Sequence, residues 1–379
     1  MMLGPILLAL MSFLFTICSA CPSDNVTYTF TTNMTTNSTN HLKPRYWSVP
    51  ATSGEGTILG PWPVTTYDAV NGNQAHIPYC YVDAKSVGKL PALMGEAFSN
   101  WKTAIDKSAL DFVPDCENGI LECECSPNTS PNTLRIKAVN SADTPGIPPG
   151  GGRATVGYGY DSSVAGRQTL EIADYDPMDF GPNHPKSVLM VAHELGHVLG
   201  LAHEHQRPSR GEDLTFYCVA LRGYWKAVND VAKAKQNPDK DRPLPNECLV
   251  NCSPKCCMDR YICQVPAYAN AWFPAALQYT IGPTHDSDKD FVEGPDITTT
   301  SVDHESIMIY GSYNFAENRG TFPKGSVLTW RERGWSEDFE IFLGGNANPA
   351  LAGPSAGDVD RVVELYPKNI VKVSGSDGW

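Results

Sequence analysis

Three histidines lie within one short stretch of the chain, HELGHVLGLAH, at residues 193–203. A spacing of four residues places His193 and His197 on the same side of a helix. Gly200 then permits the left-handed turn that ends a helix, which brings His203 back toward the same point. The pattern therefore requires a helix, a sharp turn and a returning loop around three imidazoles.

Three neutral imidazoles bind Zn²⁺ and leave one position open for water, whose pKa the ion lowers to about 7. Glu194 follows the first histidine, where its carboxylate can take a proton from that water and hand it to a leaving amine. A zinc ion that only stabilises the fold is the main alternative, but it has no need of Glu194. The sequence predicts one catalytic zinc held by His193, His197 and His203.

The motif is expected on a helix over residues 185–199. Pro185 suits the first turn of a helix, where its missing N–H costs nothing. Apolar residues recur at helical spacing and predict a buried face; they are Val188, Val191, Leu195 and Val198.

The 379 residues suffice for one large domain or two modest ones. A formal net charge of −13 leaves no broad basic surface for nucleic acid. Residues 1–20 form an apolar run that ends in small residues, and we interpret it as a signal peptide, with a membrane anchor as the alternative. The run is short for a stable membrane span. We therefore predict a secreted, extracellular protein.

Residues 21–72 are rich in Thr, Asn, Ser, Pro and Gly, a composition that packs poorly. Glycosylation sequons start at Asn25, Asn33 and Asn37. We expect an exposed, glycosylated pro-region or linker.

Ten cysteines of the predicted domain form an even set, which suits disulfide bonds in an oxidising compartment. Five of them cluster in CLVNCSPKCCMDRYIC, residues 248–263. A metal knuckle is conceivable there, but the adjacent Cys256 and Cys257 favour a disulfide knot. Residues 236–300 are too long for an ordinary connection, so we expect an inserted, disulfide-rich segment.

The pattern of expected elements indicates an α+β fold with a sheet in the N-terminal part. A helix is expected over residues 87–105 and a last helix over 356–367. The domain itself is expected to span residues 73–367, followed by a tail at 368–379. Strands are expected at HIPYCYVD (76–83), LDFVP (110–114), TLRIKAV (133–139), ATVGYGYDSS (154–163) and QTLEIAD (168–174).

The histidine string resembles the zinc motif of the metzincin peptidases. Its continuation, HEHQRPSR, is similar to the astacin pattern H-E-x-x-R-x-D-R. His203, Glu204, Arg207 and Arg210 match, whereas Ser209 stands where the family has Asp. The resemblance implies that a zymogen is activated by cleavage, which we expect within residues 45–75, and that Glu204 then lies near the new N-terminus.

A second match, SIMIYG, resembles the astacin Met-turn S-x-M-H-Y. Taken alone it is a buried, strand-like run, but together with the zinc motif it favours a functional interpretation. Ser306, Met308 and Tyr310 match, and Ile309 replaces the usual His. The resemblance implies that Met308 forms an apolar floor under the zinc ligands and that Tyr310 stabilises the tetrahedral intermediate.

The resemblance spans about residues 76–367 and implies a metzincin fold: a twisted mixed sheet, two long helices and an irregular C-terminal subdomain. It implies a zinc-dependent endopeptidase that acts on protein or peptide substrates. A matrixin-like or serralysin-like peptidase is the runner-up. The chain departs from the astacin pattern in two further ways. No cysteine follows Cys263 to tie the end of the domain to its start, and no F-x-G-D motif precedes the domain.

Several residues near these motifs carry weaker predictions. Residues 154–161 are the candidate edge strand that would pair with a substrate backbone. His184 and His205 are off the motif spacing and are expected to be exposed or in a second layer, while His304 is left open. The acidic run at 286–296 could bind calcium, but a solvated loop is favoured.

Two alternatives come from other functional classes. One is a zinc-stabilised secreted binding protein of the same fold, against which Glu194 argues, because a pure binder has no use for that carboxylate. The other is an adhesion or recognition protein whose working part is the segment 236–300. That protein would bind its partner even after zinc is removed.

Overall fold

The computed structural model describes fifteen stretches of the chain, and all of them lie in the second of two compact units, His41–Trp379. The expected signal peptide, the three sequons, most of the acidic run and the tail beyond Lys368 lie outside them. The described residues are 47–48, 59–63, 66–68, 72–116, 122–144, 146–160, 166–176, 184–207, 213–239, 242–281, 292–293, 302–318, 320, 322–331 and 337–368.

A mixed six-stranded sheet forms the N-terminal part, which confirms the α+β class. Its order is β3-β4-β6-β9-β7, and β5 pairs with β4. Strands β4, β5, β6 and β9 are parallel, whereas β3 and β7 run antiparallel to their neighbours. The strands are β3 (Thr66–Asp68), β4 (Gly72–Tyr81), β5 (Leu110–Pro114), β6 (Leu134–Val139), β7 (Gly152–Ala154) and β9 (Thr169–Ala173).

The single helix expected over residues 87–105 is wrong, because the chain forms three short helices there. They are α1 (Ala84–Lys89), α2 (Pro91–Asn100) and α3 (Lys102–Lys107). Pro91 lacks the N–H that a continuous helix needs, so it starts α2 instead. Trp101 interrupts the chain again, and its indole N–H donates to the carbonyl of Ala192 at 2.8 Å.

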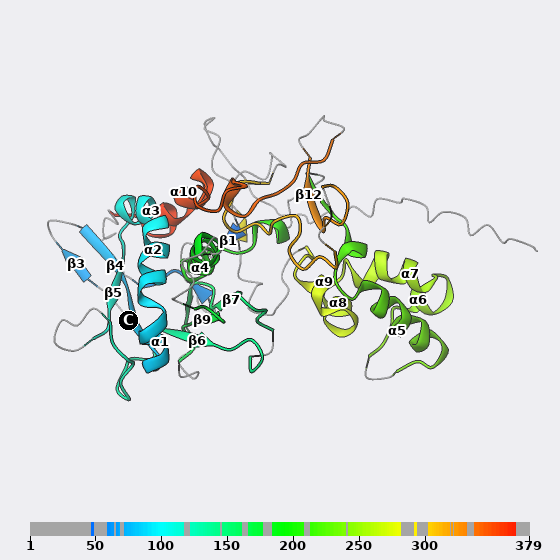
Figure 1. Cartoon of the computed structure of the whole chain (residues 1–379), viewed down its shortest axis with the longest axis horizontal. Helices are drawn as coiled ribbons and strands as arrows, with labels where there is room; N and C mark the ends of the chain where they lie inside the picture. The colour runs from blue at the N-terminus through cyan, green and yellow to red at the C-terminus, as the bar shows by residue number, and fades with distance from the viewer. Residues whose placement is uncertain are drawn as a thin grey trace, which may run out of the picture. The chain divides into compact units, whose positions relative to one another are not determined.

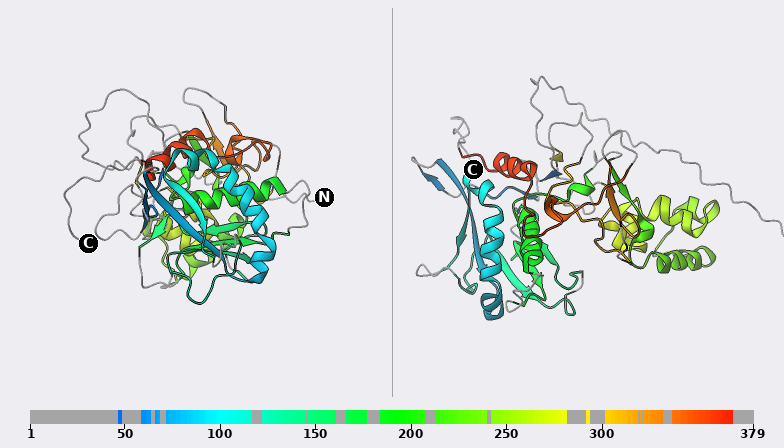
Figure 2. Two further views of the ribbon diagram at one scale, coloured as in Figure 1. Left: turned by 90° about the vertical axis from the view of Figure 1, so that its left-hand side faces the viewer. Right: turned by 45° about the horizontal axis from the view of Figure 1, so that its top comes forward.

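Helix α4 (His184–Val198) carries the first two histidines of the motif, one residue from the expected start. It packs against α2, and the two helices stand side by side in Figures 1 and 2. Gly200 adopts a φ of 97° and ends the helix, as the sequence predicts. The two long helices implied by the resemblance are only partly present in this region, because α4 is continuous and its neighbour is broken.

The core beneath these helices is continuous from the sheet to the Met-turn. Trp101, Ile136 and Leu195 are fully buried in it, and Met308 belongs to the same cluster and approaches α4 at Gly196. Gly196 allows that approach: a Cβ atom there would lie 2.4 Å from the sulfur of Met308. Any larger residue at this point of the motif helix would therefore overlap Met308 unless that side chain moved.

Part of the segment expected to be an exposed linker is buried instead. Strand β2 (Leu59–Gly60) pairs antiparallel with β8 (Tyr158–Gly159). Trp62 is 3% exposed, and its indole N–H donates to the carbonyl of Val198 at 2.9 Å. The expectation of exposure is wrong for these residues, because two bulky apolar side chains outweigh a polar composition. Cleavage within 45–75 stays a prediction.

The chain after α4 is mainly helical with short strands. Strand β10 pairs with β12, and β1 pairs with β11. The last helix, expected over 356–367, is present as α10 (Ala356–Leu365). Strand β1 (Trp47–Ser48) precedes the six-stranded sheet in the sequence. The other elements after α4 are β10 (Leu214–Phe216), α5 (Tyr224–Gln236), α6 (Asn246–Val250), α7 (Pro254–Cys257), α8 (Pro266–Trp272), α9 (Pro274–Leu277), β11 (Val292–Glu293) and β12 (Leu328–Trp330).

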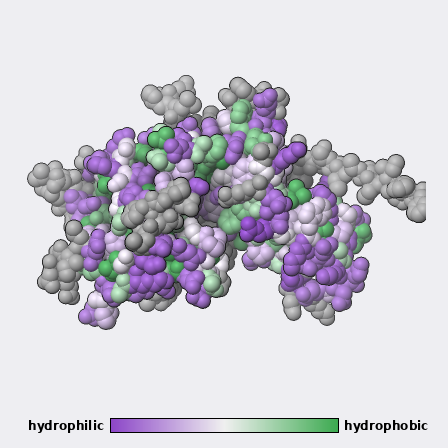
Figure 3. Space-filling view, in the orientation of Figure 1, coloured by the Kyte–Doolittle hydropathy of each residue, from purple (hydrophilic) through white to green (hydrophobic). Residues whose placement is uncertain are grey.

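The exposed side of α5 is polar. Figure 3 shows a largely hydrophilic face over α5, which carries Lys226, Asp230 and Lys233 on its exposed side. Within the stretches that the structure describes, no helix is both long and apolar enough to cross a bilayer.

Four disulfide bonds hold the described part of the chain. They join Cys80 to Cys125, Cys116 to Cys123, Cys218 to Cys263 and Cys248 to Cys257. The expected disulfide knot is thus partly formed, with one bond inside the 236–300 segment and one that ties it to the residues before α5. The sulfurs of Cys252 and Cys256 lie 3.0 Å apart, but they do not form a disulfide bond.

We predict that Cys252 and Cys256 form a fifth disulfide bond in the secreted protein. Their sulfurs are already in contact, and the oxidising compartment supplies disulfide exchange partners that accept the two electrons. Peptide mapping without reduction should find the two residues linked, and iodoacetamide should label neither until the protein is reduced. Labelling of either sulfur before reduction would contradict the prediction.

We predict that Gly196→Ala destabilises the domain by about 1–3 kcal/mol, because the added methyl group overlaps the Met308 sulfur. The matched control is Gly95→Ala in α2, where an added Cβ has no neighbour within 4 Å. That variant should gain about 0.5–1 kcal/mol from helix propensity. Urea unfolding compares the two, and equal effects would show that the Met308 contact is not tight.

Candidate metal centre

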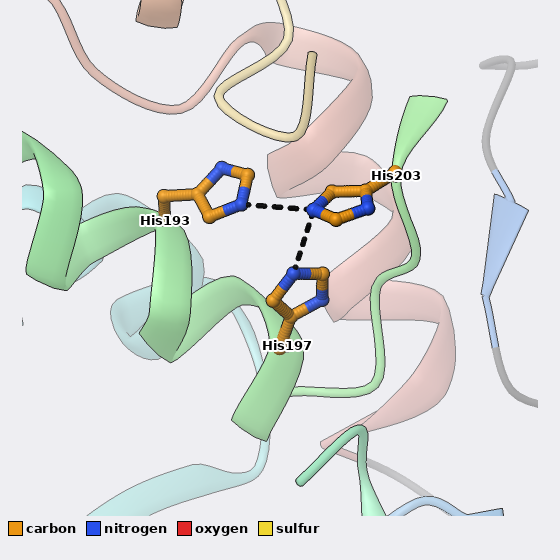
Figure 4. Close-up of side chains that lie close together, drawn as sticks. All are labelled: His193, His197 and His203. Carbon is orange, nitrogen blue, oxygen red and sulfur yellow. Dashed lines mark hydrogen bonds between the residues drawn. The ribbon is translucent and has the colours of Figure 1, made fainter. Parts of the chain in front are cut away.

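The structure brings the three predicted histidines together. His193 and His197 project from α4, and His203 faces them from the loop that follows (Figure 4). The Nε2 atom of His203 lies 3.2 Å from Nε2 of His193 and 3.1 Å from Nε2 of His197. Across the described stretches, these three residues are the one group of histidine, cysteine or acidic side chains placed to hold a metal ion.

The second nitrogen of each ring has its own acceptor. Nδ1 of His193 lies 2.6 Å from the carbonyl oxygen of Ile307, and Nδ1 of His197 lies 2.9 Å from that of Leu201. Nδ1 of His203 lies 2.9 Å from Oε1 of Gln206. A carbonyl or amide oxygen only accepts, so each Nδ1 carries the proton and each Nε2 carries a lone pair.

The lone pairs of His193 and His197 therefore each face that of His203 at little more than 3 Å, all three Nε2 atoms lie within 4.8 Å of one another, and none of them can donate to another. Two nitrogens bound to one tetrahedral zinc at 2.0–2.1 Å would be about 3.3 Å apart. The observed separations of 3.1 and 3.2 Å fit that value. The donor set is chemically suited to a divalent transition metal, and three imidazoles leave a coordination position open.

The electrostatics of the site keep the rings neutral. Burial lowers the pKa of His193 to about 4 and that of His197 to about 3. The pKa of His203 is also well below its usual range, first through burial and then through the neighbouring histidines. All three imidazoles are thus in the ligand form at neutral pH.

Glu194, the predicted general base, is 7% exposed and lies on the same helix as the first two histidines. Burial raises the pKa of its carboxyl to about 8, while a hydrogen bond from the backbone N–H of Ala154 acts in the opposite direction. One carboxylate oxygen is therefore held by β7.

The edge of the sheet passes close to this carboxylate. A Cβ atom on Gly152 would lie 2.6 Å from Cγ of Glu194, so any larger residue at this position would displace that side chain. Strand β7 ends the strand order of the sheet, whereas β8 is covered by β2. The edge strand expected at 154–161 is thus misplaced, because the chain bends at Gly157, with φ of 61°, and the edge is Gly152–Ala154.

The predicted Met-turn lies directly beneath the histidines. Met308 is 1% exposed, and its carbonyl accepts from the N–H of Glu204 at 3.0 Å. The carboxylate of Asp358 on α10 accepts from the hydroxyl of Ser306 at 2.6 Å and from the N–H of Ile307 at 2.8 Å. Asp358 therefore fixes the carbonyl that orients His193.

Tyr310, the second predicted catalytic residue, borders the histidines. Its ring centroid lies 4.6 Å from that of His203, and its hydroxyl donates to Oε1 of Gln278 at 3.3 Å. Burial raises the pKa of the phenol, and Glu194 raises it further, so Tyr310 keeps its proton at neutral pH. The phenol therefore keeps its proton, which it donates to Gln278 in this arrangement.

The other histidines that the structure describes do not join the cluster. His184 lies 3.0 Å from a carboxylate oxygen of Glu96, and His304 stacks on Trp330 with a centroid distance of 3.8 Å. His205 is completely buried behind His203, which supports a second layer rather than exposure.

Only part of the predicted continuation of the motif can be placed. Glu204 pairs with Arg207 at 3.0 Å, and both side chains are buried. Burial raises the pKa of Glu204 to about 8, although Arg207 opposes the shift. Ser209 and Arg210 lie outside the described residues.

Sequence reasoning missed three residues that support the site: Gln206, Gln278 and Asp358. Gln206 and Gln278 belong to no pattern, since one orients a histidine locally and the other arrives from the inserted segment. Asp358 could have been noticed, because Ser355 and Asp358 form a capping box at the start of α10.

No protein-family model matches the sequence, and no curated protein matches it. Solved structures do match. A structure of myroilysin aligns with a TM-score of 0.40 at 15% identity and covers 86% of this chain and 100% of that chain. High choriolytic enzyme 1, a hatching enzyme zinc-protease from the medaka fish Oryzias latipes, aligns with a TM-score of 0.37 at 15% identity, covering 80% and 94%.

A crystal structure of myroilysin gives a TM-score of 0.36 at 14% identity, covering 83% of this chain and 89% of that chain. Likenesses this weak establish no function for the chain. Its site is interpreted below from its own geometry.

We predict that zinc raises the unfolding temperature of the metal-free protein. Zinc at a hundred times its Kd would add about 2.7 kcal/mol if it binds only the folded state. His197→Ala should abolish the shift, whereas His184→Ala, on the same helix but outside the cluster, should keep it. A thermal melt with and without zinc measures this, and the same shift in both variants would exclude the predicted ligands.

Proposed function

We propose that this chain is a secreted zinc-dependent endopeptidase of the astacin type, with the fold of the metzincin clan. One observation carries the proposal: three Nε2 lone pairs converge beside a buried glutamate that directly follows the first of the histidines. A zinc site that served only the fold would not need that carboxylate. Four disulfide bonds support an oxidising, extracellular location.

His193, His197 and His203 would hold the zinc ion through Nε2. When bound, zinc supplies a Lewis acid that polarises a carbonyl group and brings the pKa of water near neutrality. Glu194 acts as general base by accepting the proton of the attacking water, and then as general acid by giving it to the leaving amine.

Tyr310 completes the set of groups that touch the substrate. Its hydroxyl carries a proton at neutral pH and its ring lies beside His203, so a turn of the hydroxyl away from Gln278 would let it donate to the oxyanion that forms on the scissile carbonyl. Met308 does not reach the substrate in this proposal. It supports the motif helix, because it is buried against Gly196.

Strand β7 is the candidate platform for the substrate backbone. It is the edge of the sheet, and it hydrogen-bonds to the general base through Ala154. A peptide that adds as a further strand at this edge would lie beside Glu194. Recognition of the backbone explains how a peptidase can act on unrelated protein sequences.

We predict that Glu194→Gln binds zinc with unchanged stoichiometry and loses at least about 10²-fold in kcat, because the amide cannot accept a proton from water. Hydrolysis of casein by the secreted protein, before and after removal of its N-terminal segment, measures the loss. Phenanthroline should abolish the wild-type activity, and added zinc should restore it.

The matched control is Glu122→Gln, an exposed glutamate in the loop between β5 and β6, which should cleave casein at the wild-type rate. Normal turnover by Glu194→Gln would rule out the proposed mechanism. A folded, trimmed protein that binds zinc and cleaves nothing would favour the zinc-stabilised binding protein.

A further inference from the structure

Part of the inserted segment contacts the residues that border the histidine cluster, which are His205, Gln206 and Tyr310. The four residues of this part begin at the last residue of α9 and are Leu277, Gln278, Tyr279 and Thr280, which we call the 277–280 segment. Three of the four are buried, and Gln278 is half-buried. The segment belongs to the part of the chain that the sequence predicts to be a disulfide-rich insertion.

The first link runs through Gln206 to the third histidine. The side-chain amide of Gln206 donates to the carbonyl of Leu277 at 3.2 Å, and its oxygen accepts from Nδ1 of His203 at 2.9 Å. One hydrogen bond fixes which end of the amide faces the ring. The carbonyl of Leu277 thus determines that His203 presents its lone pair to the cluster.

The second link runs through His205 to the tyrosine. Nε2 of His205 donates to the carbonyl of Gln278 at 2.8 Å, and Nδ1 accepts from the backbone N–H of Tyr310 at 3.3 Å. The side-chain oxygen of Gln278 accepts from the Tyr310 hydroxyl at 3.3 Å. Gln278 therefore holds both ends of Tyr310, directly at the hydroxyl and through His205 at the backbone.

The segment itself is held in place by its surroundings. Tyr279 is fully buried, stacks on Phe216 at a centroid distance of 4.9 Å, and donates its hydroxyl to the carbonyl of Asn314 at 2.6 Å. Leu277 and Tyr279 share a hydrophobic cluster with the disulfide-bonded Cys263. The segment is thus anchored in the core behind the site.

We propose that the inserted segment is a positioning element of the metal site: Gln278 places the hydroxyl of Tyr310, and Leu277 orients His203 through Gln206. The proposal rests on the proposed function for Tyr310, whereas the link to His203 requires only that the histidines bind a metal. In this proposal the insertion contributes directly to the geometry of the active centre.

The link to Tyr310 is tested with Gln278→Met, which keeps the side-chain length but removes the acceptor. We expect kcat on a peptide that the wild type cleaves to fall about tenfold to a hundredfold, with KM and zinc content unchanged. In the Tyr310→Phe background the same substitution should have no further effect, because the hydroxyl is already gone. Gln264→Met, an exposed glutamine of the same insertion, is the control and should match the wild type.

An equal loss in both backgrounds would mean that Gln278 is only structural, and no loss would mean that it does not position Tyr310. Either result overturns this half of the proposal. A wild-type protein without peptidase activity would instead refute the proposed function.

The link to His203 is tested without any turnover. Gln206→Met should weaken zinc binding about 10–100-fold in competition with a chromophoric chelator, since the partner that orients the third ligand is lost. Gln278→Met and Gln264→Met should leave zinc affinity unchanged. Wild-type affinity in Gln206→Met would overturn the assignment of Leu277 and Gln206, whatever the protein hydrolyses.

Discussion

Three hydrogen bonds on the outer side of the imidazoles are the constraint on which the rest of the site depends. The acceptors for Nδ1 are the carbonyls of Ile307 and Leu201 and the amide oxygen of Gln206. With these protons fixed outward, the three lone pairs must face one another. That arrangement is unfavourable in the absence of a cation, so the surrounding structure has to enforce it.

Each acceptor is in turn fixed by a different part of the chain. Ile307 is held by Asp358 on α10, and Gln206 is held by Leu277 at the end of α9. Leu201 is held locally, since its N–H donates to the carbonyl of Gly196 across the turn at Gly200. The geometry of the motif therefore depends on elements up to about 160 residues away in the sequence.

This division explains what could be predicted from the sequence. The motif helix, its end at Gly200, the strands near residues 76–83 and 110–114 and the three histidines follow local spacing, and the structure places them as expected. Pro91 indicates the break in the helix expected over residues 87–105, but the apolar spacing alone does not reveal it. Gln278, Asp358 and the burial of Trp62 depend on long-range contacts, and no periodicity records those.

The state of Glu194 bears on whether a metal in this site would be structural or catalytic. Burying a carboxylate costs free energy, and here one backbone N–H gives partial compensation, so its pKa rises to about 8. A cation held by the neighbouring histidines would favour the ionised form and so return the carboxylate to use as a base. An apolar residue would stabilise a purely structural site better at this position. The proton transfer proposed above for Glu194 would account for a destabilising carboxylate at this position.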